Sequence, residues 1–407
     1  MVHAHAHEFA FAVVIRVLLA FSPLESFLQD DNQLSSSLTS YSRLLEGVYL
    51  FRQHGIDPYT GGTFRHSPLL LSLFSTVIPA TRIPPKLLWT FFDAVSAWAL
   101  VNIWRSRSNT RKHERDLRIA AIYLINPYIF LPCLALSTST IETTLQLLVL
   151  LFASWGQSSP SLLALALLVH LSLPAILLLL PVLLLLLSDP LSHLASPRPF
   201  PQRLGKCILL FVEFAIFFVA LLFASTLAAG GWSWMRNTWG AGILLPDLTP
   251  NPGLWWYFFT EIFDHFRPFF LAVFSLHLSV YVVPLCIKFQ HDPLYAGFLL
   301  LGILGTFKPY PTLSDPGLFL SLISLFPETY RYLRYPMVTT LLHLHALLLL
   351  PLFHHLWIGT GTGNANFFYA STLVFGLANG GALLDCTWAG LRVAIGEEKD
   401  GWVVTQE

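Results

Sequence analysis

The sequence has very little charge. Only 11% of its 407 residues are Asp, Glu, Lys or Arg, whereas 55% are hydrophobic. Soluble domains carry about a quarter of charged residues, because their surfaces face water. A chain this poor in charge cannot cover a soluble globule, so it must place its apolar surface in lipid.

Positive charge shows no surplus either. The 23 basic and 23 acidic residues balance, which leaves no basic footprint for nucleic acid. Cysteine is also scarce: the four cysteines lie far apart, each in or beside an apolar segment, and none forms a C-x-x-C pair. We interpret them as buried small hydrophobic residues and not as a disulfide framework.

The first eight residues lack the basic region of a signal peptide, and the apolar stretch 9–21 lacks a small-residue cleavage site. We therefore expect this stretch to be retained as a first membrane span. His3, His5 and His7 alternate in the tail before it, but a tail does not pre-arrange metal ligands. We expect neither a metal nor another cofactor.

Hydrophobic runs predict an all-α polytopic membrane protein with about twelve spans, since a spanning helix needs roughly 20 apolar residues. The clear candidates are 9–28, 87–104, 119–136, 207–229, 267–288, 336–357 and 367–388. Shorter or proline-broken candidates are 140–155, 161–173, 175–188, 293–307 and 313–327.

The basic loop 105–118 belongs on the cytoplasmic side by the positive-inside rule. The run 68–78 is too short to cross, and we predict a helix that lies in the lumenal interface. Both termini are then cytoplasmic. We expect one multi-spanning domain over 1–407, with a first lumenal loop at 29–86 and a lumenal aromatic loop at 230–266.

Three carboxylates fall within predicted spans, namely Asp93, Glu142 and Glu213. Charged groups are costly in lipid, so we expect them to face the bundle interior or a partner helix. The leucine-rich stretch 162–187 is interrupted by Pro174 and Pro181, and we expect a broken helix that faces lipid. No internal repeat indicates an inverted-repeat transporter.

The first loop contains Glu46-Gly47, then Pro58-Tyr59, then a Ser-Pro-Leu-Leu sequence at 67–70. This order resembles the first lumenal loop of the endoplasmic-reticulum mannosyltransferases that use dolichol-phosphate-mannose and share the GT-C architecture. Asn126-Pro-Tyr and Ser137-Thr resemble their later spans. Those enzymes carry an acidic pair where this chain has 39–41, Thr-Ser-Tyr. The nearby pair Asp30-Asp31 lacks the neighbouring motif, and we interpret it as a solvated loop start.

The most specific block runs from Pro246 to Phe266 and contains PDLTPNPGLWWYFF. Further blocks follow in order at 307–312, 356–358 and 363–370. Together they resemble the PIG-U family of GPI transamidase subunits. The resemblance implies a GT-C-like bundle in the endoplasmic-reticulum membrane that has lost glycosyl transfer and presents the GPI lipid. The nucleophile would lie in a PIG-K subunit, alongside PIG-T, PIG-S and GAA-type partners.

Several residues of these blocks suit a lipid site. Aromatic side chains with polar neighbours favour a membrane interface. Asn amides in a Gly-rich loop offer donors and acceptors to sugars or phosphates. Lys308 either reaches the interface or meets a lipid phosphate. We expect no catalytic residue in this chain, and we predict these lipid-binding residues: Asp247, Asn251, Trp256, Phe259, Glu261, Lys308, Tyr310, Asn364, Asn366 and Phe367.

The alternative functions and site chemistries would each require particular residues. Glu261 and His265 are four residues apart, so on one helix they would lie on the same face. There they could form either a structural hydrogen bond with each other or an acid–base pair. An active mannosyltransferase would need an essential carboxylate in the first loop. A transporter or scramblase would need a continuous polar path, which the predicted spans do not show.

Overall fold

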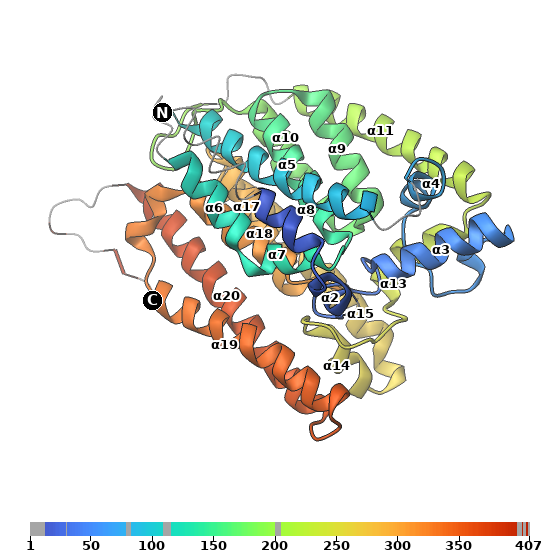
Figure 1. The fold of residues 1–407 in the computed structure, drawn as a ribbon. Coiled ribbons are helices and arrows are strands. Elements are labelled where there is room, and N and C mark those ends of the chain that lie inside the picture. The colour runs from blue at the N-terminus through green and yellow to red at the C-terminus, as the bar shows by residue number, and fades with distance from the viewer. Residues whose placement is uncertain are drawn as a thin grey trace.

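The computed structural model of the chain is an all-α bundle (Figure 1). It describes residues 13–29, 31–78, 83–108, 115–199, 205–396, 401 and 404–405. Within these ranges the chain forms no strand, and its one β-bridge, His193–Ser196, is isolated. The class predicted from composition is therefore confirmed.

The helices follow the predicted apolar segments closely. After helical residues 13–20 come α2 (Leu24–Leu28), α3 (Tyr41–His54), η1 (Pro58–Thr60), α4 (Pro68–Thr76), α5 (Ile83–Arg107), α6 (Asp116–Ile125) and α7 (Pro127–Leu134). The middle of the chain forms α8 (Ser139–Ser154), α9 (Ser158–Leu171), η3 (Leu173–Leu178), α10 (Leu179–Leu187), α11 (Lys206–Ala229), α12 (Ser233–Asn237), α13 (Trp239–Leu244), α14 (Trp255–Glu261) and η4 (Asp264–Phe266). The last part forms α15 (Arg267–Val280), α16 (Val282–Lys288), α17 (Pro293–Phe307), α18 (Ser314–Leu322), η5 (Ile323–Leu325), η6 (Pro327–Tyr332), α19 (Pro336–His354), the π-turn η7 (His355–Gly359) and α20 (Ala365–Ile395).

Polar caps fix where several helices begin. Asn126 precedes Pro127 and accepts the backbone N–H of Tyr128, which starts α7. Asp292 does the same before α17 by accepting the N–H of Tyr295. Proline suits the first helical turn because its missing N–H has no helical partner there, and the cap satisfies a free donor.

Among the described residues, five helices are long and apolar enough to cross a membrane: α5, α11, η4 to α16, α19 to η7, and α20. Helices α6 and α7 make a sixth if this pair, bent by 56°, is one span. The other predicted spans correspond to five shorter apolar helices, except 9–28, whose first residues lie outside the described ranges. The run at 68–78 forms the nine-residue α4, too short to cross, as predicted.

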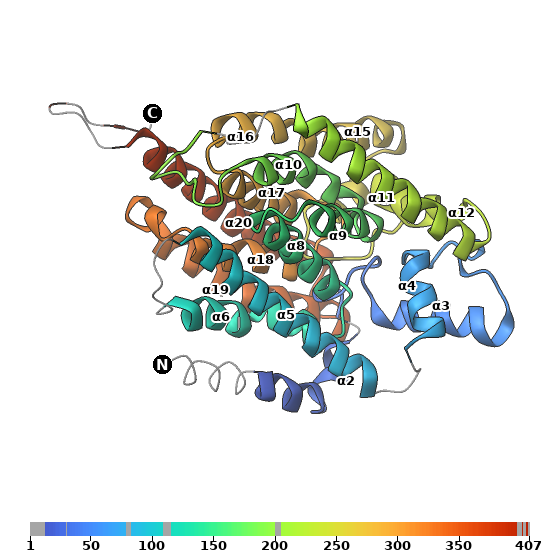
Figure 2. The same ribbon diagram turned by 90° about the horizontal axis from the view of Figure 1, so that it is seen from above.

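Helix α17 lies at the centre of the bundle, and every residue in it except Phe307 is buried. In Figure 2, α8, α9, α10, α17 and α18 lie between α11, α15 and α16 on one edge and α2, α5 and α6 on the other. Gly302 makes this packing close, because a Cβ there would lie 2.7 Å from the Phe319 ring. Short central helices are thus wrapped by longer outer ones.

The leucine-rich stretch 162–187 is broken by η3, as predicted, but it does not face lipid. Leu162, Leu165, Leu168 and Val182 are all fully buried in the main core. The prediction of a lipid-facing segment was therefore wrong. A helix that is apolar on all sides suits either lipid or a protein core, so its composition did not indicate which.

Two of the three carboxylates within the spans are buried, as expected, and the third is hydrogen-bonded to a neighbouring helix. Asp93 is buried and pairs with Arg16 at 3.1 Å. Glu142 is buried beside Lys308. Glu213 is half-buried and accepts a hydrogen bond from Ser159. Each of the three carboxylates thus contacts a polar or charged group of the protein.

Candidate functional site

Asp247 joins three sequence blocks at one end of the bundle. Its backbone N–H donates to the Tyr310 hydroxyl at 3.2 Å, and that hydroxyl donates to the Asp247 carbonyl at 2.7 Å. Its carboxylate accepts from Arg43 of the first loop at 3.0 Å. The motif segment 246–261, the segment 307–312 and helix α3 are therefore held together through this residue.

The Asp247 carboxylate is held in its charged form. Burial raises its pKa, but hydrogen bonds from Thr249 and Arg43 outweigh that effect and bring the pKa to about 2. Tyr310 is 4% exposed, and burial raises its pKa to about 12. An ionised carboxylate and a neutral phenol thus form a fixed junction, and neither group titrates near neutral pH.

Asn251 forms a tight turn after this junction. Its amide nitrogen donates to the Thr249 carbonyl at 3.1 Å, and its amide oxygen accepts from the Gly253 N–H at 2.9 Å. The side chain is buried, and the turn uses both of its polar ends. Asn251 therefore shapes the motif segment, because Asn side chains commonly form a turn by hydrogen-bonding to the backbone two residues away.

Lys308 lies inside the bundle. Its ammonium is 2.6 Å from Asp315 and 3.8 Å from Glu142, and its side chain is 8% exposed. A lysine that reached the interface would leave its ammonium in water. The snorkelling alternative is therefore wrong, because the two carboxylates hold the ammonium in the interior. A contact with a lipid phosphate stays a prediction.

A second cluster is aromatic and joins α14 to the α19–α20 turn. Trp256 is buried and stacks on Trp357 with ring centroids 6.2 Å apart. Tyr257 stacks on Tyr369 at 4.5 Å, and its hydroxyl donates to the Asn366 side-chain oxygen. The motif segment therefore runs from the Asp247 junction to this cluster. Figure 1 shows α14 beside the turn between α19 and α20.

The asparagines at the start of α20 are exposed. Asn364 caps the helix by accepting the N–H of Phe367 at 3.2 Å. Asn366 lies in the first helical turn, so the predicted Gly-rich loop ends two residues earlier than expected. Phe367 is 51% exposed and stacks on Phe353 at 5.8 Å. These residues present an amide and an aromatic ring at the surface.

The other predicted residues of the motif segment, Phe259 and Glu261, do not lie together. Phe259 is 2% exposed and packs in a core with Trp255 and Phe274. Glu261 is exposed at the end of α14, beside the Tyr257 hydroxyl. The backbone leaves the helix at Ile262, with ψ 145°, so Glu261 and His265 do not share a helix face. The prediction of a paired Glu261 and His265 was wrong.

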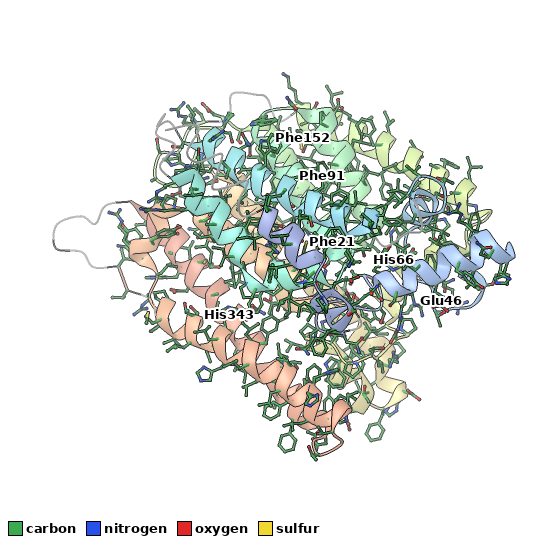
Figure 3. The ribbon with its side chains drawn as sticks, in the orientation of Figure 1. Phe21, Glu46, His66, Phe91, Phe152 and His343 are labelled. Carbon is green, nitrogen blue, oxygen red and sulfur yellow. The ribbon has the colours of Figure 1, made fainter. Side chains whose placement is uncertain are left out.

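His66 holds the first loop in shape (Figure 3). The ring of His66 is within 2.8 Å of the Ser40 carbonyl, and the His66 carbonyl accepts from Tyr59 at 2.8 Å. Burial lowers the pKa of His66 to about 4. A neutral histidine therefore donates to the loop backbone and fixes α3 relative to α4.

Known proteins resemble this chain over most of its length. A family model for the GPI transamidase subunit PIG-U matches residues 10–375. The chain belongs to the PIG-U family. It is 34% identical to GPI transamidase component GAB1 of Saccharomyces cerevisiae, with 94% of this chain and 93% of that protein covered. It is 32% identical to GPI-anchor transamidase component PIGU of Homo sapiens, with 94% and 92% covered.

The family blocks converge on one end of the bundle. Thr138 donates to the Thr39 carbonyl at 2.9 Å, which joins the α7–α8 block to the first loop. Thr39 occupies the place where the mannosyltransferase resemblance would put an acidic pair. It lines a cavity of about 50 Å³ together with Glu142, Trp239, Lys308 and Tyr310. The blocks 126–138, 246–266 and 307–312 therefore either line this cavity or contact a residue that lines it, whereas 356–358 and 363–370 meet the motif segment at the aromatic cluster.

The structure brings the predicted residues into two groups. Asp247, Asn251, Lys308 and Tyr310 lie at or near the cavity, whereas Trp256, Glu261, Asn364, Asn366 and Phe367 lie in or beside the aromatic cluster. Sequence reasoning missed Arg43 and the cavity-lining role of Glu142. A carboxylate inside a predicted span was a signal for Glu142, but its partner could not be read from spacing.

Proposed function

We propose that this chain binds the GPI lipid within the GPI transamidase and holds it for transfer to proprotein C-termini. The convergence of the family blocks on the Asp247 junction and the aromatic cluster carries this proposal. The cluster exposes the Asn366 amide and the Phe367 ring beside each other in one turn. An amide suits sugar hydroxyls or phosphates, and an aromatic ring suits the apolar part of an amphiphile.

Lipid access is consistent with the outer helices. Helices α11, α15 and α19 carry many exposed large hydrophobic side chains, among them Leu227, Leu276 and Leu348. Such side chains in a membrane protein face acyl chains or the apolar helices of partner subunits. The turn between α19 and α20 therefore joins an apolar surface to a polar one, as an amphiphile requires.

We assign the chemistry to another subunit. Cys133, Cys286 and Cys386 are buried and Cys207 is half-buried, and none belongs to the Asp247 junction or the aromatic cluster. A cysteine nucleophile needs an exposed position and a base beside it. This supports a non-catalytic subunit that works with PIG-K, PIG-T, PIG-S and GAA-type subunits. We place it in the endoplasmic-reticulum membrane, with the site lumenal and both termini cytoplasmic.

The test is a pull-down of the tagged full chain in mild detergent, with subunits and GPI lipid measured by mass spectrometry. The variant is Asn364→Ala/Asn366→Ala, and the matched control is Asn102→Ala on α5, where the amide donates to the Trp98 carbonyl of the same helix. We expect all three proteins to retain the transamidase subunits and only the double variant to lose GPI lipid. Equal lipid in the double variant would overturn the proposed site, and a wild-type preparation without GPI lipid would overturn the proposed function.

A further inference from the structure

Helix α19 lies along the edge of the bundle (Figure 1) and packs mainly against α20. Its outward side carries a row of exposed large apolar side chains, namely Met337, Leu341, Leu344, Leu348 and Leu352. Steps of three or four residues keep this row on one side of the helix. Such a row suits acyl chains and the apolar side of another helix equally, so it does not by itself identify what covers it.

His345 places a polar group in this row, deep in the span. The candidate span Pro336–Gly359 has 24 residues, which makes a helix of about 36 Å against about 30 Å of hydrocarbon. His345 is its tenth residue, roughly 14 Å from the first and therefore about 10 Å inside the hydrocarbon. An imidazole is too short to reach the headgroups from there. A charged ring is costlier than a neutral one at this depth, so the ring is neutral.

One hydrogen bond fixes which nitrogen of His345 carries the hydrogen. The ring Nδ1 lies 2.7 Å from the Leu341 carbonyl of the same helix. A carbonyl oxygen only accepts, so Nδ1 is the donor. In a neutral imidazole the other nitrogen is then an acceptor. Nε2 of His345 is exposed on the outward side and has no partner among the described residues.

His343 shows how the same helix treats a histidine that faces protein. It lies two residues earlier and is half-buried. The Tyr128 hydroxyl donates to the His343 carbonyl at 3.0 Å and lies 3.4 Å from the ring Nδ1. Polar side chains within spans usually obtain such partners from neighbouring helices. An acyl chain offers no donor, so lipid would leave Nε2 of His345 without a hydrogen bond.

We propose that the outward side of α19 is a docking surface for a transmembrane helix of another transamidase subunit, which donates a hydrogen bond to Nε2 of His345. The donor is a hydroxyl, an amide or an indole N–H, because these groups can donate inside the hydrocarbon without carrying charge. Leu341 and Leu348 pack against the apolar part of the same helix. The chain belongs to a family of transamidase subunits, so the occupant is a helix of that complex and not a second copy of this chain. The inference does not rest on binding of the GPI lipid.

The test places the photoreactive residue p-benzoylphenylalanine at position 348, one helical turn from His345 on the same side. The tagged full chain is irradiated in native membranes, and its adducts are identified by mass spectrometry. We expect an adduct with a transamidase subunit, within a transmembrane segment that has a hydroxyl, amide or indole no more than one turn from the cross-linked residue. Adducts with lipid alone, or with a second copy of this chain, would overturn the inference.

Variants at His345 test the hydrogen bond itself. His345→Leu removes the acceptor and keeps an apolar side chain, so the adduct yield should fall about threefold or more, as for loss of an interhelical hydrogen bond in a membrane. His345→Gln keeps an acceptor and should retain most of the yield. Thr340→Val is the matched control, because its hydroxyl donates to the Pro336 carbonyl of the same helix on a different side.

Equal yields in His345→Leu and wild type would also overturn the inference. The adducts of the wild-type sequence can overturn it without any His345 variant, so the test does not depend on how well those variants fold. GPI lipid in the pull-down is measured separately and decides the proposed function alone.

Discussion

Arg107 and Asp292 are 185 residues apart in the sequence and meet in a buried two-pronged ion pair. Nη1 of Arg107 donates to Oδ1 of Asp292 at 2.8 Å, and Nη2 donates to Oδ2 at 2.6 Å. The same guanidinium reaches Glu328 at 2.5 Å and lies 4.6 Å from the Phe326 ring. This contact joins the end of α5 to the start of the central helix α17 and to η6.

Asp292→Asn should destabilise the chain strongly. The Arg107 and Asp292 side chains are 6% and 1% exposed, so the variant leaves a buried guanidinium with Glu328 as its one remaining carboxylate partner among the described residues. Breaking a buried pair costs about 3–5 kcal/mol in the free energy of unfolding. The measurement is the amount of intact, fluorescently tagged full chain after heating of detergent-extracted membranes.

Arg198→Gln is the control for that measurement. Its pair with Asp189 has a similar length, 3.0 Å, but the side chains are 43% and 29% exposed. Exposed pairs contribute less than about 1 kcal/mol, because water and salt screen them. Equal heat resistance of the two variants would show that the Arg107 pair does not hold the bundle together.

His66 predicts a pH dependence of stability. Its pKa in the folded chain is about 4, against 6.5 when unfolded, and burial is the main cause. Between these values the unfolded chain binds the additional proton, so the free energy of unfolding falls as pH drops, by about 3 kcal/mol in total. The contribution is complete above pH 6.5 and is lost toward pH 4. Asp247 loses its own contribution only below pH 3.8, toward about 2.

His66→Gln isolates this effect, since glutamine also donates to the Ser40 carbonyl but does not titrate. Apparent melting temperatures of the tagged chain should fall less steeply in the variant than in wild type between about pH 7 and pH 4. Other titrating groups are common to both proteins and cancel in the difference. Identical slopes would mean that His66 is not buried in its neutral form.

Gly253→Ala tests the contact between the motif segment and 307–312. A Cβ at Gly253 would lie 2.7 Å from the Pro311 ring and 2.8 Å from the Asn251 side-chain oxygen. Because the proline ring cannot rotate away, the backbone must shift, at a cost of about 1–3 kcal/mol. We expect less GPI lipid in the pull-down. Gly231→Ala, in the same loop with nothing within 4 Å, should behave as wild type, and equal effects would refute the contact.

Much of the fold could be predicted because the signals are local. Apolar length indicated most helices to within a few residues, as for 293–307, which α17 matches at both ends. The inward placement of Asp93 and Glu142 followed from the cost of charge in lipid. Recognition of the family relied on ordered motifs, of which 246–266 was the most specific.

Pairings over long sequence distances could not be predicted. Nothing in the spacing of Glu142, Lys308 and Asp315 indicates that they share one site, because the contact depends on how α8, α17 and α18 pack. The same holds for Leu162 and its neighbours, whose composition suits core and lipid equally. The break at Ile262 was missed because aromatic residues occur on both sides of it, and the next proline, Pro268, comes only in the first turn of α15.

Tyr257→Phe tests whether the orientation of the Asn366 side chain affects binding of the GPI lipid. The variant removes the hydroxyl that donates to the Asn366 side-chain oxygen and keeps the ring that stacks on Tyr369 at 4.5 Å. The bond is exposed, so stability should change by less than about 1 kcal/mol. If the amide must be held to meet the lipid headgroup, GPI lipid in the pull-down falls while the subunits remain. Tyr257→Ala also loses the stack and should lose more lipid. Wild-type lipid in Tyr257→Phe would show that this hydrogen bond does not position Asn366 for binding.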